Sequence, residues 1–425
     1  MKETVKSVVL AVLVVSSLLQ TLLLAYNKPD IIPLDSPEYI EAELHGEHAE
    51  LTQLVNPKDM VIHFGENQHT VLYPGDTFFR IILERLSQHT FGELDETYPG
   101  TNARIAAMKD ERTGIEIRFR TLVPSSVLAD RLNLDTAPEE PLWLSRIWLF
   151  AETNSGVGRV RALFETEFGW REAGRLDISL PELTQYVNFG KYVHPPFSRI
   201  AADIYVPAEP LELSPAVKMR YTEYTPDQLR NSLFVNPGTS RSILQQDGME
   251  IITDGKRGLQ IDHRLKWMAY SDPAAPVEEP ADLAVQLDSA VQFVNQHGGW
   301  NGRYLLDRLP KGTDTAFRFI QYYDSLPIYP QVGQQYGNIQ VTMKQGTAVG
   351  YERSLIQPDE RSVEITPYTL PGGERLMSRL SDVDLASVRS IHPVYKARIT
   401  DDWIELTPAW AVEHGDGKVE ILDLS

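Results

Sequence analysis

The sequence predicts an α+β protein: one N-terminal transmembrane helix, then a three-domain extracellular body of antiparallel sheets with packed helices. Three observations predict this class. A run of 20 residues near the N-terminus carries no charge. The rest of the chain is polar, and many of its short apolar stretches alternate with a period of two, as strands do. A few longer stretches carry the 3.6-residue period of amphipathic helices, which adds helices to the sheets.

The uncharged run, Ser7–Tyr26, is long enough to cross a bilayer. As a helix it would measure about 30 Å, the thickness of the hydrocarbon core. Lys2 and Lys6 precede it, and positive charge favours the cytoplasmic side, so the body is expected outside the cell. A cleaved signal peptide is the alternative, but it would have a shorter apolar core and a small-residue cleavage site. We therefore expect residues 1–28 to be a cytoplasmic tip and a retained anchor.

The predicted anchor has one polar face. Ser16, Ser17, Gln20 and Thr21 are spaced so that they share one side of a helix. Such faces let membrane helices approach closely and hydrogen-bond, at about 0.6–2 kcal/mol for each polar contact. Serine and threonine can instead bond back to their own helix, and the sequence leaves that alternative open. Gln20 favours a partner helix, so these four residues are the candidate contact positions.

Charge and composition exclude several classes of function. The whole chain carries −19 at pH 7, and Lys2, Glu3 and Lys6 contribute +1, so the body carries −20. That charge disfavours nucleic acid and anionic surfaces, which attract basic patches. The chain has no cysteine, which removes thiol catalysis and cysteine metal sites. At 425 residues, its domains can be held by hydrophobic cores without disulfides.

Residues 29–180 are predicted to form an N-terminal α+β domain. Asp76 begins a helix that runs to about residue 89, with apolar residues on one face. Residues 113–122 alternate cleanly and predict a half-buried strand. The residues on the solvent side of that strand are expected to be Glu116, Arg118 and Arg120. Residues 146–151 and 159–164 predict a hairpin, with Trp143 and Trp148 in the core.

Residues 181–275 are predicted to form a central α+β domain. Its first part is rich in proline and is expected to be extended. Thr225-Pro226-Asp227 begins a short helix that runs to about residue 234. Residues 249–253 and 259–263 predict a second hairpin. The proline-rich stretch 271–280 then indicates a domain boundary.

Residues 280–425 are predicted to form a C-terminal α+β domain. It begins with an amphipathic helix over residues 281–297, which Gly298-Gly299 ends. A second helical stretch is expected over 374–385. The predicted strands cover residues 316–322, 338–343, 349–356, 394–399, 403–406, 410–413 and 419–422, with a break at Pro408. The central and C-terminal segments share one order of elements, so these two domains are expected to be similar to each other.

The sequence contains no catalytic signature. The nucleophile elbow, the phosphate-binding loop and the dinucleotide-binding fingerprint are all absent. His45 and His48 flank Gly46-Glu47, but this spacing does not fit a helical zinc site and favours surface histidines. Paired carboxylates such as Glu139-Glu140 lie in proline-rich segments and are typical of solvated loops. We therefore predict no enzyme activity and no catalytic, cofactor-binding or metal-ligating residue.

Several features, taken in order along the chain, point to one family. Met1–Ser7 runs straight into the anchor, and Pro29-Asp30 follows it. Phe64-Gly65 and Leu72-Tyr73-Pro74 precede the first predicted helix, and Leu406-Thr407-Pro408-Ala409-Trp410 precedes the closing hairpin. In this layout the chain resembles the YycH family. Those proteins are single-pass membrane proteins of Gram-positive bacteria with an extracellular three-domain body.

The resemblance implies regulation without catalysis and without a cofactor. Members of that family associate with a similar anchored protein, YycI, and with the sensor histidine kinase YycG, also called WalK. The kinase belongs to a two-component system for cell-wall metabolism, and the family's transmembrane helix is implicated in contacting the kinase. The resemblance also implies that the central and C-terminal domains are similar. Two other classes stay open: an anchored wall enzyme that uses paired carboxylates, and an anchored ligand-binding module.

Overall fold

The computed structural model describes residues 6, 17, 44, 46–134, 142–154, 157–192, 195–201, 203–246, 248–275, 282–422 and 424. Its contacts divide the chain into two units, Met1–Ile40 and Glu41–Ser425. Ser16, Gln20 and Thr21 lie outside the described residues, whereas Ser17 is helical and exposed. Among the described residues, no helix combines the length and the apolar character that crossing a bilayer requires.

The second unit is a mixed α+β fold, as the sequence predicts. Its named strands form two sheets that are antiparallel apart from one parallel pair, β17 with β22. The first sheet has nine strands in the order β3-β7-β6-β5-β4-β1-β2-β8-β9. These strands are β1 (Asp59–Gly65), β2 (Gln68–Leu72), β3 (Leu94–Thr97), β4 (Thr113–Pro124), β5 (Trp143–Asn154), β6 (Val157–Thr166), β7 (Gly169–Ala173), β8 (Phe197–Ala201) and β9 (Ile204–Pro207).

The helices of this half are α2 (Leu51–Leu54), α3 (Thr77–Leu86), α4 (Asn102–Glu111), α5 (Ser125–Leu132) and α6 (Leu180–Gly190). Helices α4, α5 and α6 pack on strands of the first sheet, α3 packs on α6, and α2 contacts α5 and strand β15 of the second sheet, described below. The predicted helix over 77–89 is confirmed as α3, with Ile82 and Leu86 buried. The sequence reading missed α6, although a capping box marks its start, in which Ser179 and Glu182 bond each other's backbone. The predicted boundary near residue 181 therefore lies in the first turn of α6.

The second sheet has fifteen strands. They are β10 (Ala216–Glu223), β11 (Arg241–Leu244), β12 (Met249–Thr253), β13 (Gly258–Asp262), β14 (Trp267–Ser271), β15 (Arg303–Arg308), β16 (Ala316–Tyr323), β17 (Leu326–Pro330), β18 (Asn338–Lys344), β19 (Thr347–Ser354), β20 (Ile356–Pro358), β21 (Glu364–Thr366), β22 (Val388–Ile399), β23 (Trp403–His414) and β24 (Val419–Leu422). The helices of this half are α7 (Pro226–Leu233), α8 (Leu283–Gln296) and α9 (Gly373–Leu380). The predicted helices at 226, 281 and 374 and the hairpin β12–β13 are confirmed.

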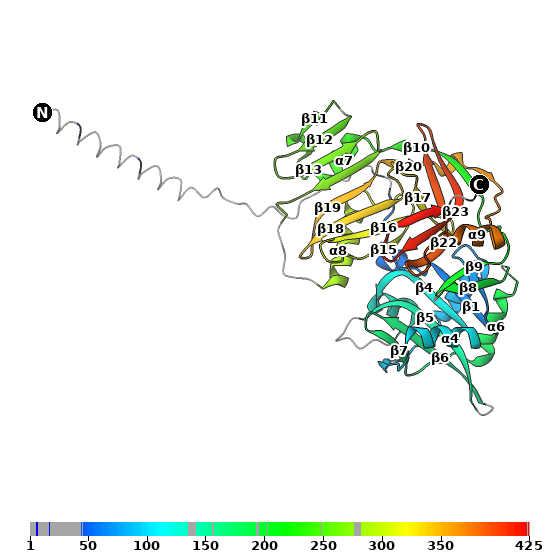
Figure 1. Ribbon diagram of the computed structural model, residues 1–425. Helices are drawn as coiled ribbons and strands as arrows, with labels where there is room; N and C mark the ends of the chain where they lie inside the picture. Colours follow the sequence, from blue (N-terminus) through cyan, green and yellow to red (C-terminus); the bar gives the residue numbers. More distant parts are fainter. Residues whose placement is uncertain are drawn as a thin grey trace. The chain divides into compact units, whose positions relative to one another are not determined.

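Strands from the predicted central and C-terminal segments interleave in this sheet. β14 of the central segment pairs with β19, and β10 pairs with β23. The two sheets also share apolar cores: one cluster combines Ile62 and Ile117 of the first sheet with Val291 and Tyr351 of the second half. Figure 1 shows β9 of the first sheet beside β22 and α9. The three-domain division stays a prediction.

Two details of the strand prediction are wrong. The predicted break at Pro408 does not occur, because β23 runs without interruption from Trp403 to His414. On one side of β23, residues up to Leu406 pair with β10 and residues from Trp410 onward pair with β24, so Pro408 faces no partner strand there. The second error concerns β4. Its expected solvent side is buried: Glu116 is 0% exposed, and Arg118 and Arg120 are each 8% exposed.

A charged row and a basic cavity as the candidate functional site

Strand β4 presents one apolar face and one charged face, because successive side chains of a strand point to opposite sides. Ile115, Ile117 and Phe119 enter the largest apolar core. Glu116, Arg118 and Arg120 lie on the other face, and we call these three residues the charged row. Charged side chains are almost never fully buried without partners. The chain therefore has to supply a partner for each member of the row.

Each member of the charged row pairs with a different element. Lys109 Nζ of α4 lies 2.6 Å from Glu116 Oε1. Asp59, directly opposite Arg118 on β1, accepts two hydrogen bonds from that guanidinium, at 2.6 and 2.8 Å. Asp307 of β15, in the second sheet, accepts a bond of 2.7 Å from Arg120 Nε. The charged face of β4 can be buried because α4, β1 and β15 each place an opposite charge against it.

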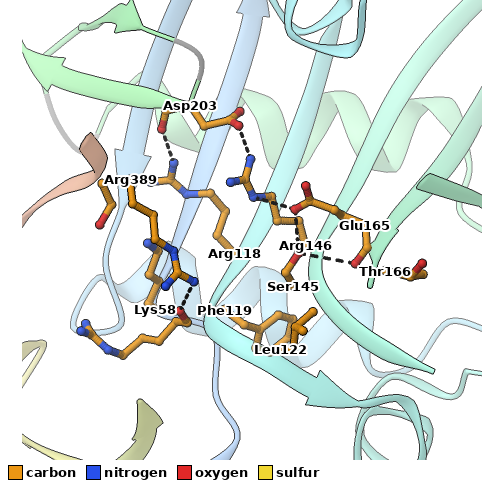
Figure 2. A pocket seen from close by; sticks show the side chains of 12 residues that line it. Lys58, Arg118, Phe119, Leu122, Ser145, Arg146, Glu165, Thr166, Asp203 and Arg389 are labelled. Atoms are coloured by element: carbon orange, nitrogen blue, oxygen red, sulfur yellow. Dashed lines mark hydrogen bonds and ion pairs between the residues drawn. The ribbon is translucent and has the colours of Figure 1, made fainter. Parts of the chain in front are cut away.

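Asp203, which precedes β9, completes this network. Arg118 and Arg146 are directly opposed on β4 and β5, and like charges in that position repel. Asp203 lies between them: its backbone oxygen accepts from Arg118 Nη1 at 2.9 Å, and its carboxylate pairs with Arg146 (Figure 2). Burial by itself raises the pKa of the Asp203 carboxyl. Lys109 and Arg146 outweigh that effect and lower the pKa to about 2. Asp203 is therefore ionised at neutral pH and holds the two arginines in place.

Two histidines of the β1–β2 hairpin extend the network. His63 and His69 are fully buried, and their Nδ1 atoms lie 2.9 Å apart. At that distance one ring donates and the other accepts, so the accepting ring is neutral. Burial lowers the pKa of His63. Burial, and second the proximity of the His63 ring, which would repel a second protonated ring, lowers the pKa of His69 to about 4. The pKa of Glu116 is held well below its usual range, since Lys109, His63 and Arg146 outweigh its burial.

A cavity of about 330 Å³ opens beside the Arg118 and Arg120 end of the row. Five cationic side chains line it: Lys58, Arg118, Arg120, Arg146 and Arg389. They come from the residue before β1, from β4 and β5, and from β22 of the second sheet. Two carboxylates, Glu165 and Asp203, also line the cavity (Figure 2). A protein whose body carries −20 thus contains a local concentration of positive charge between its two sheets.

A wider groove of about 870 Å³ continues from this cavity, and the two share Leu122, Ser145 and Arg389. In the groove, three further cations, Arg308, Lys311 and Arg318, face four carboxylates, Asp307, Asp314, Glu413 and Asp416. The groove is therefore close to neutral, whereas the smaller cavity is basic.

The carboxylates of the cavity are poorly suited to glycoside hydrolysis. Glu165 Oε2 lies 3.0 Å from Arg146 Nε, and Asp203 pairs with the same guanidinium. A glycosidase needs one carboxyl group with a raised pKa to act as an acid. Although burial raises the pKa of Asp203, Lys109 and Arg146 lower it to about 2, so this carboxyl is ionised and does not serve as that acid. With Glu165 and Asp203 both paired to Arg146, the arrangement suits binding of a ligand.

The structure places few of the residues that the sequence singled out. His48 is exposed, as expected, and His45 and Glu139-Glu140 lie outside the described residues. The described residues contain no cluster of three side chains that could hold a metal ion. The sequence reading missed the charged row and the cavity. One signal pointed to them: three charges at two-residue intervals on a strand, with Asp59 and Arg146 on strands that flank it.

Because buried histidines have lowered pKa values, we expect the stability of the fold to decrease as the pH falls. Burial lowers the pKa of His297, as of His69, to about 4, below the value of about 6.5 expected in the unfolded chain. Between pH 6.5 and 4 the unfolded state takes up protons that the folded state does not. Stability is thus full above pH 6.5 and falls towards pH 4, by about 2–3 kcal/mol for one such histidine.

Urea denaturation at a series of pH values measures this loss. His297→Gln should flatten the decline of the unfolding free energy between pH 6.5 and 4, because the substituted side chain takes up no proton. His48→Gln is the matched control at an exposed position and should leave the decline unchanged. An identical slope for wild type and His297→Gln would contradict this assignment.

Comparisons with known proteins agree with this fold. A family model described as YycH protein, N-terminal domain, matches residues 3–167, and one described as YycH protein, C-terminal domain, matches residues 201–425. The crystal structure of YycH from Bacillus subtilis is similar, with a TM-score of 0.65 and 15% sequence identity, over 89% of this chain and 98% of that one. At this identity the likeness concerns the fold alone. No curated protein matches the sequence.

Proposed function

The chain belongs to the YycH family, and on that premise we propose that it is a non-catalytic, membrane-anchored regulator of the YycG kinase system. Its partners are the sensor histidine kinase YycG, or WalK, and a YycI-like anchored protein. The N-terminus lies in the cytoplasm and the body outside the cell. The four candidate contact positions of the anchor, Ser16, Ser17, Gln20 and Thr21, touch the transmembrane helices of the kinase.

One observation carries this proposal. The match to the N-terminal family model begins at residue 3, so it includes the whole uncharged run, Ser7–Tyr26. The run is therefore part of what this chain has in common with the family, together with the body. Its length and its polar face suit a helix that binds another helix inside a bilayer.

The regulation follows from differential binding. A kinase that exchanges between two signalling states is shifted only by the difference in the anchor's affinity for them. Polar contacts between membrane helices contribute about 0.6–2 kcal/mol each. A difference of about 1–3 kcal/mol between the two states corresponds to about a 5–150-fold shift. The polar face is therefore large enough to control the kinase without any catalytic step.

Crosslinking in living cells tests the contact. A photoreactive amino acid at position 20 should capture the kinase. The same group at position 22 lies on the opposite side of the helix, about 200° away, and should capture much less. Equal crosslinking of the kinase from the two positions, or crosslinked products from position 20 that contain no kinase, would contradict the proposed helix contact.

Paired substitutions test whether the contact regulates. Ser17→Leu combined with Gln20→Leu removes the polar side chains and should reduce the change in kinase output that the wild-type protein causes. Val15→Leu combined with Leu22→Ile alters the opposite face and should leave output unchanged. The anchor alone, residues 1–28, should change kinase output in a cell that lacks the full chain. If only the full chain acts, the body is the regulating part and the proposal is wrong on this point.

A further inference from the structure

The cations of the basic cavity differ in how they are held. The guanidinium groups of Arg118, Arg120 and Arg146 are each fixed by carboxylates, as described above. Arg389 is bound less completely: its Nη2 donates to the backbone oxygen of Arg120 at 3.1 Å, and its Nη1 lies 3.3 Å from Glu413. Its side chain remains 54% exposed. Arg389 therefore closes the cavity from the second sheet while part of it stays open to solvent.

Lys58 is the exception in this set. Its backbone N–H donates to Arg118, but its side chain has no carboxylate within ion-pair distance in the part of the chain that the structure describes. Lys58 is half-buried, and its side chain lines the cavity wall (Figure 2). Removing an ammonium group from water without a counter-ion is unfavourable. An anion in the cavity would supply that counter-ion.

Size and lining indicate what kind of anion fits. A water molecule occupies about 30 Å³ of the liquid, so the cavity has room for roughly ten heavy atoms. Cations reach it from several directions, which suits a compact group with charge on several oxygens better than a flat carboxylate. A phosphate monoester carries about −1.5 to −2 at neutral pH. Phe119 and Leu122 add an apolar wall against which the rest of a small ligand can lie.

We propose that this cavity binds a small phosphate monoester whose phosphate group lies between Lys58 and Arg389. The cavity lies where the two sheets meet, so the bound ligand contacts both halves of the body. This site is independent of the anchor and of the proposed contact with the kinase. It goes beyond the proposed function, because it gives the body a ligand of its own.

The protonation state of Lys58 makes the site testable. Burial lowers the pKa of this ammonium group to about 8. The charged and titratable groups that face it are Asp59, Arg118, Arg120, Arg389, His392 and Glu413. Burial and the nearby cations hold the pKa of His392 well below its usual value, so this ring stays neutral above pH 7. Between pH 7 and 9 Lys58 therefore loses its charge, whereas a phosphate monoester, whose second pKa is about 6, is already a dianion. The affinity for glycerol 2-phosphate should fall over this range.

Calorimetry on the full chain in a neutral detergent tests the proposal, with inorganic phosphate and glycerol 2-phosphate as probes. Both should bind saturably, and about tenfold more tightly than succinate, a dicarboxylate of equal charge. Glycerol should not bind. Lys58→Met should weaken phosphate binding about tenfold or more without lowering the melting temperature, since it removes a charge that has no partner.

Lys58→Arg gives the sharper result, because arginine does not titrate in this range. It should keep phosphate binding within a few-fold of wild type at pH 7 and lose the decline between pH 7 and 9. Arg389→Gln should weaken binding, and Lys344→Met, at an exposed site outside the cavity, should not. Absence of saturable phosphate binding, equal binding of succinate, or unchanged affinity in Lys58→Met would each overturn the proposal.

Discussion

Glu116→Gln is expected to lower the free energy of unfolding by about 3–5 kcal/mol, because it removes one charge of a buried ion pair and leaves the other charge buried. Lys109 Nζ lies 2.6 Å from Glu116 and is 1% exposed, so its charge would stay buried with Asp203 as its remaining partner, at 3.0 Å. A neutral amide cannot compensate that charge. Urea denaturation of the full chain in a neutral detergent measures the loss, with tryptophan fluorescence as the signal.

Two controls separate the ion pair from the general effect of substitution. Glu84→Gln changes the same functional group on the exposed side of α3 and should alter the unfolding free energy by less than about 0.5 kcal/mol. Combining Lys109→Met with Glu116→Leu removes both charges and should recover much of the stability that Glu116→Gln loses. If Glu116→Gln lowers the free energy of unfolding by less than about 1 kcal/mol, the Lys109 ammonium group is not buried away from water in the way the structure shows.

Asp307→Asn should be the second large effect, with a loss of about 3 kcal/mol. Arg120 is buried between the sheets, and Asp307 is the carboxylate within ion-pair distance of it among the described residues. Without that charge the guanidinium keeps its bond of 2.7 Å to the Tyr329 hydroxyl and the weaker neighbours of the groove. Because Arg120 belongs to the first sheet and Asp307 to the second, the loss falls on the contact between the two sheets.

Proteolysis resolves that point. Asp307→Asn should speed the cleavage of the full chain at the junction of the sheets, because the open state becomes more populated. Asp402→Asn, at an exposed turn between β22 and β23, is the matched control and should change neither stability nor cleavage. Wild-type stability in Asp307→Asn would show that Arg120 finds another counter-charge and that the sheets are held by their apolar cores.

Much of the secondary structure could be predicted because it depends on local pattern. The helix α8 follows from its apolar period and the two glycines that end it, and α7 from Thr225 and Pro226 at its start. The hairpin β12–β13 follows from two short alternating runs around Asp254-Gly255. In each case the residues that determine the element lie within one or two turns of it. Such signals need no knowledge of the rest of the chain.

The charged row could not be predicted in the same way. Glu116, Arg118 and Arg120 alternate with apolar residues, which is the pattern of a strand with one solvent-exposed face. Their partners Asp59, Lys109, Asp203 and Asp307 are scattered over a large part of the chain, and pattern within a window cannot bring them together. The same holds for the basic cavity, whose lysine and arginines come from both sheets.

By itself, the sequence determined the α+β class, the uncharged run at the N-terminus and the family to which the chain belongs. Those properties depend on composition, local period and the order of short motifs. Only the tertiary structure decided that a charged strand face is buried and that a cavity in an acidic body is basic. Whether a charge lies in water or in the interior depends on which distant segments cover it, and long-range pairing decides that.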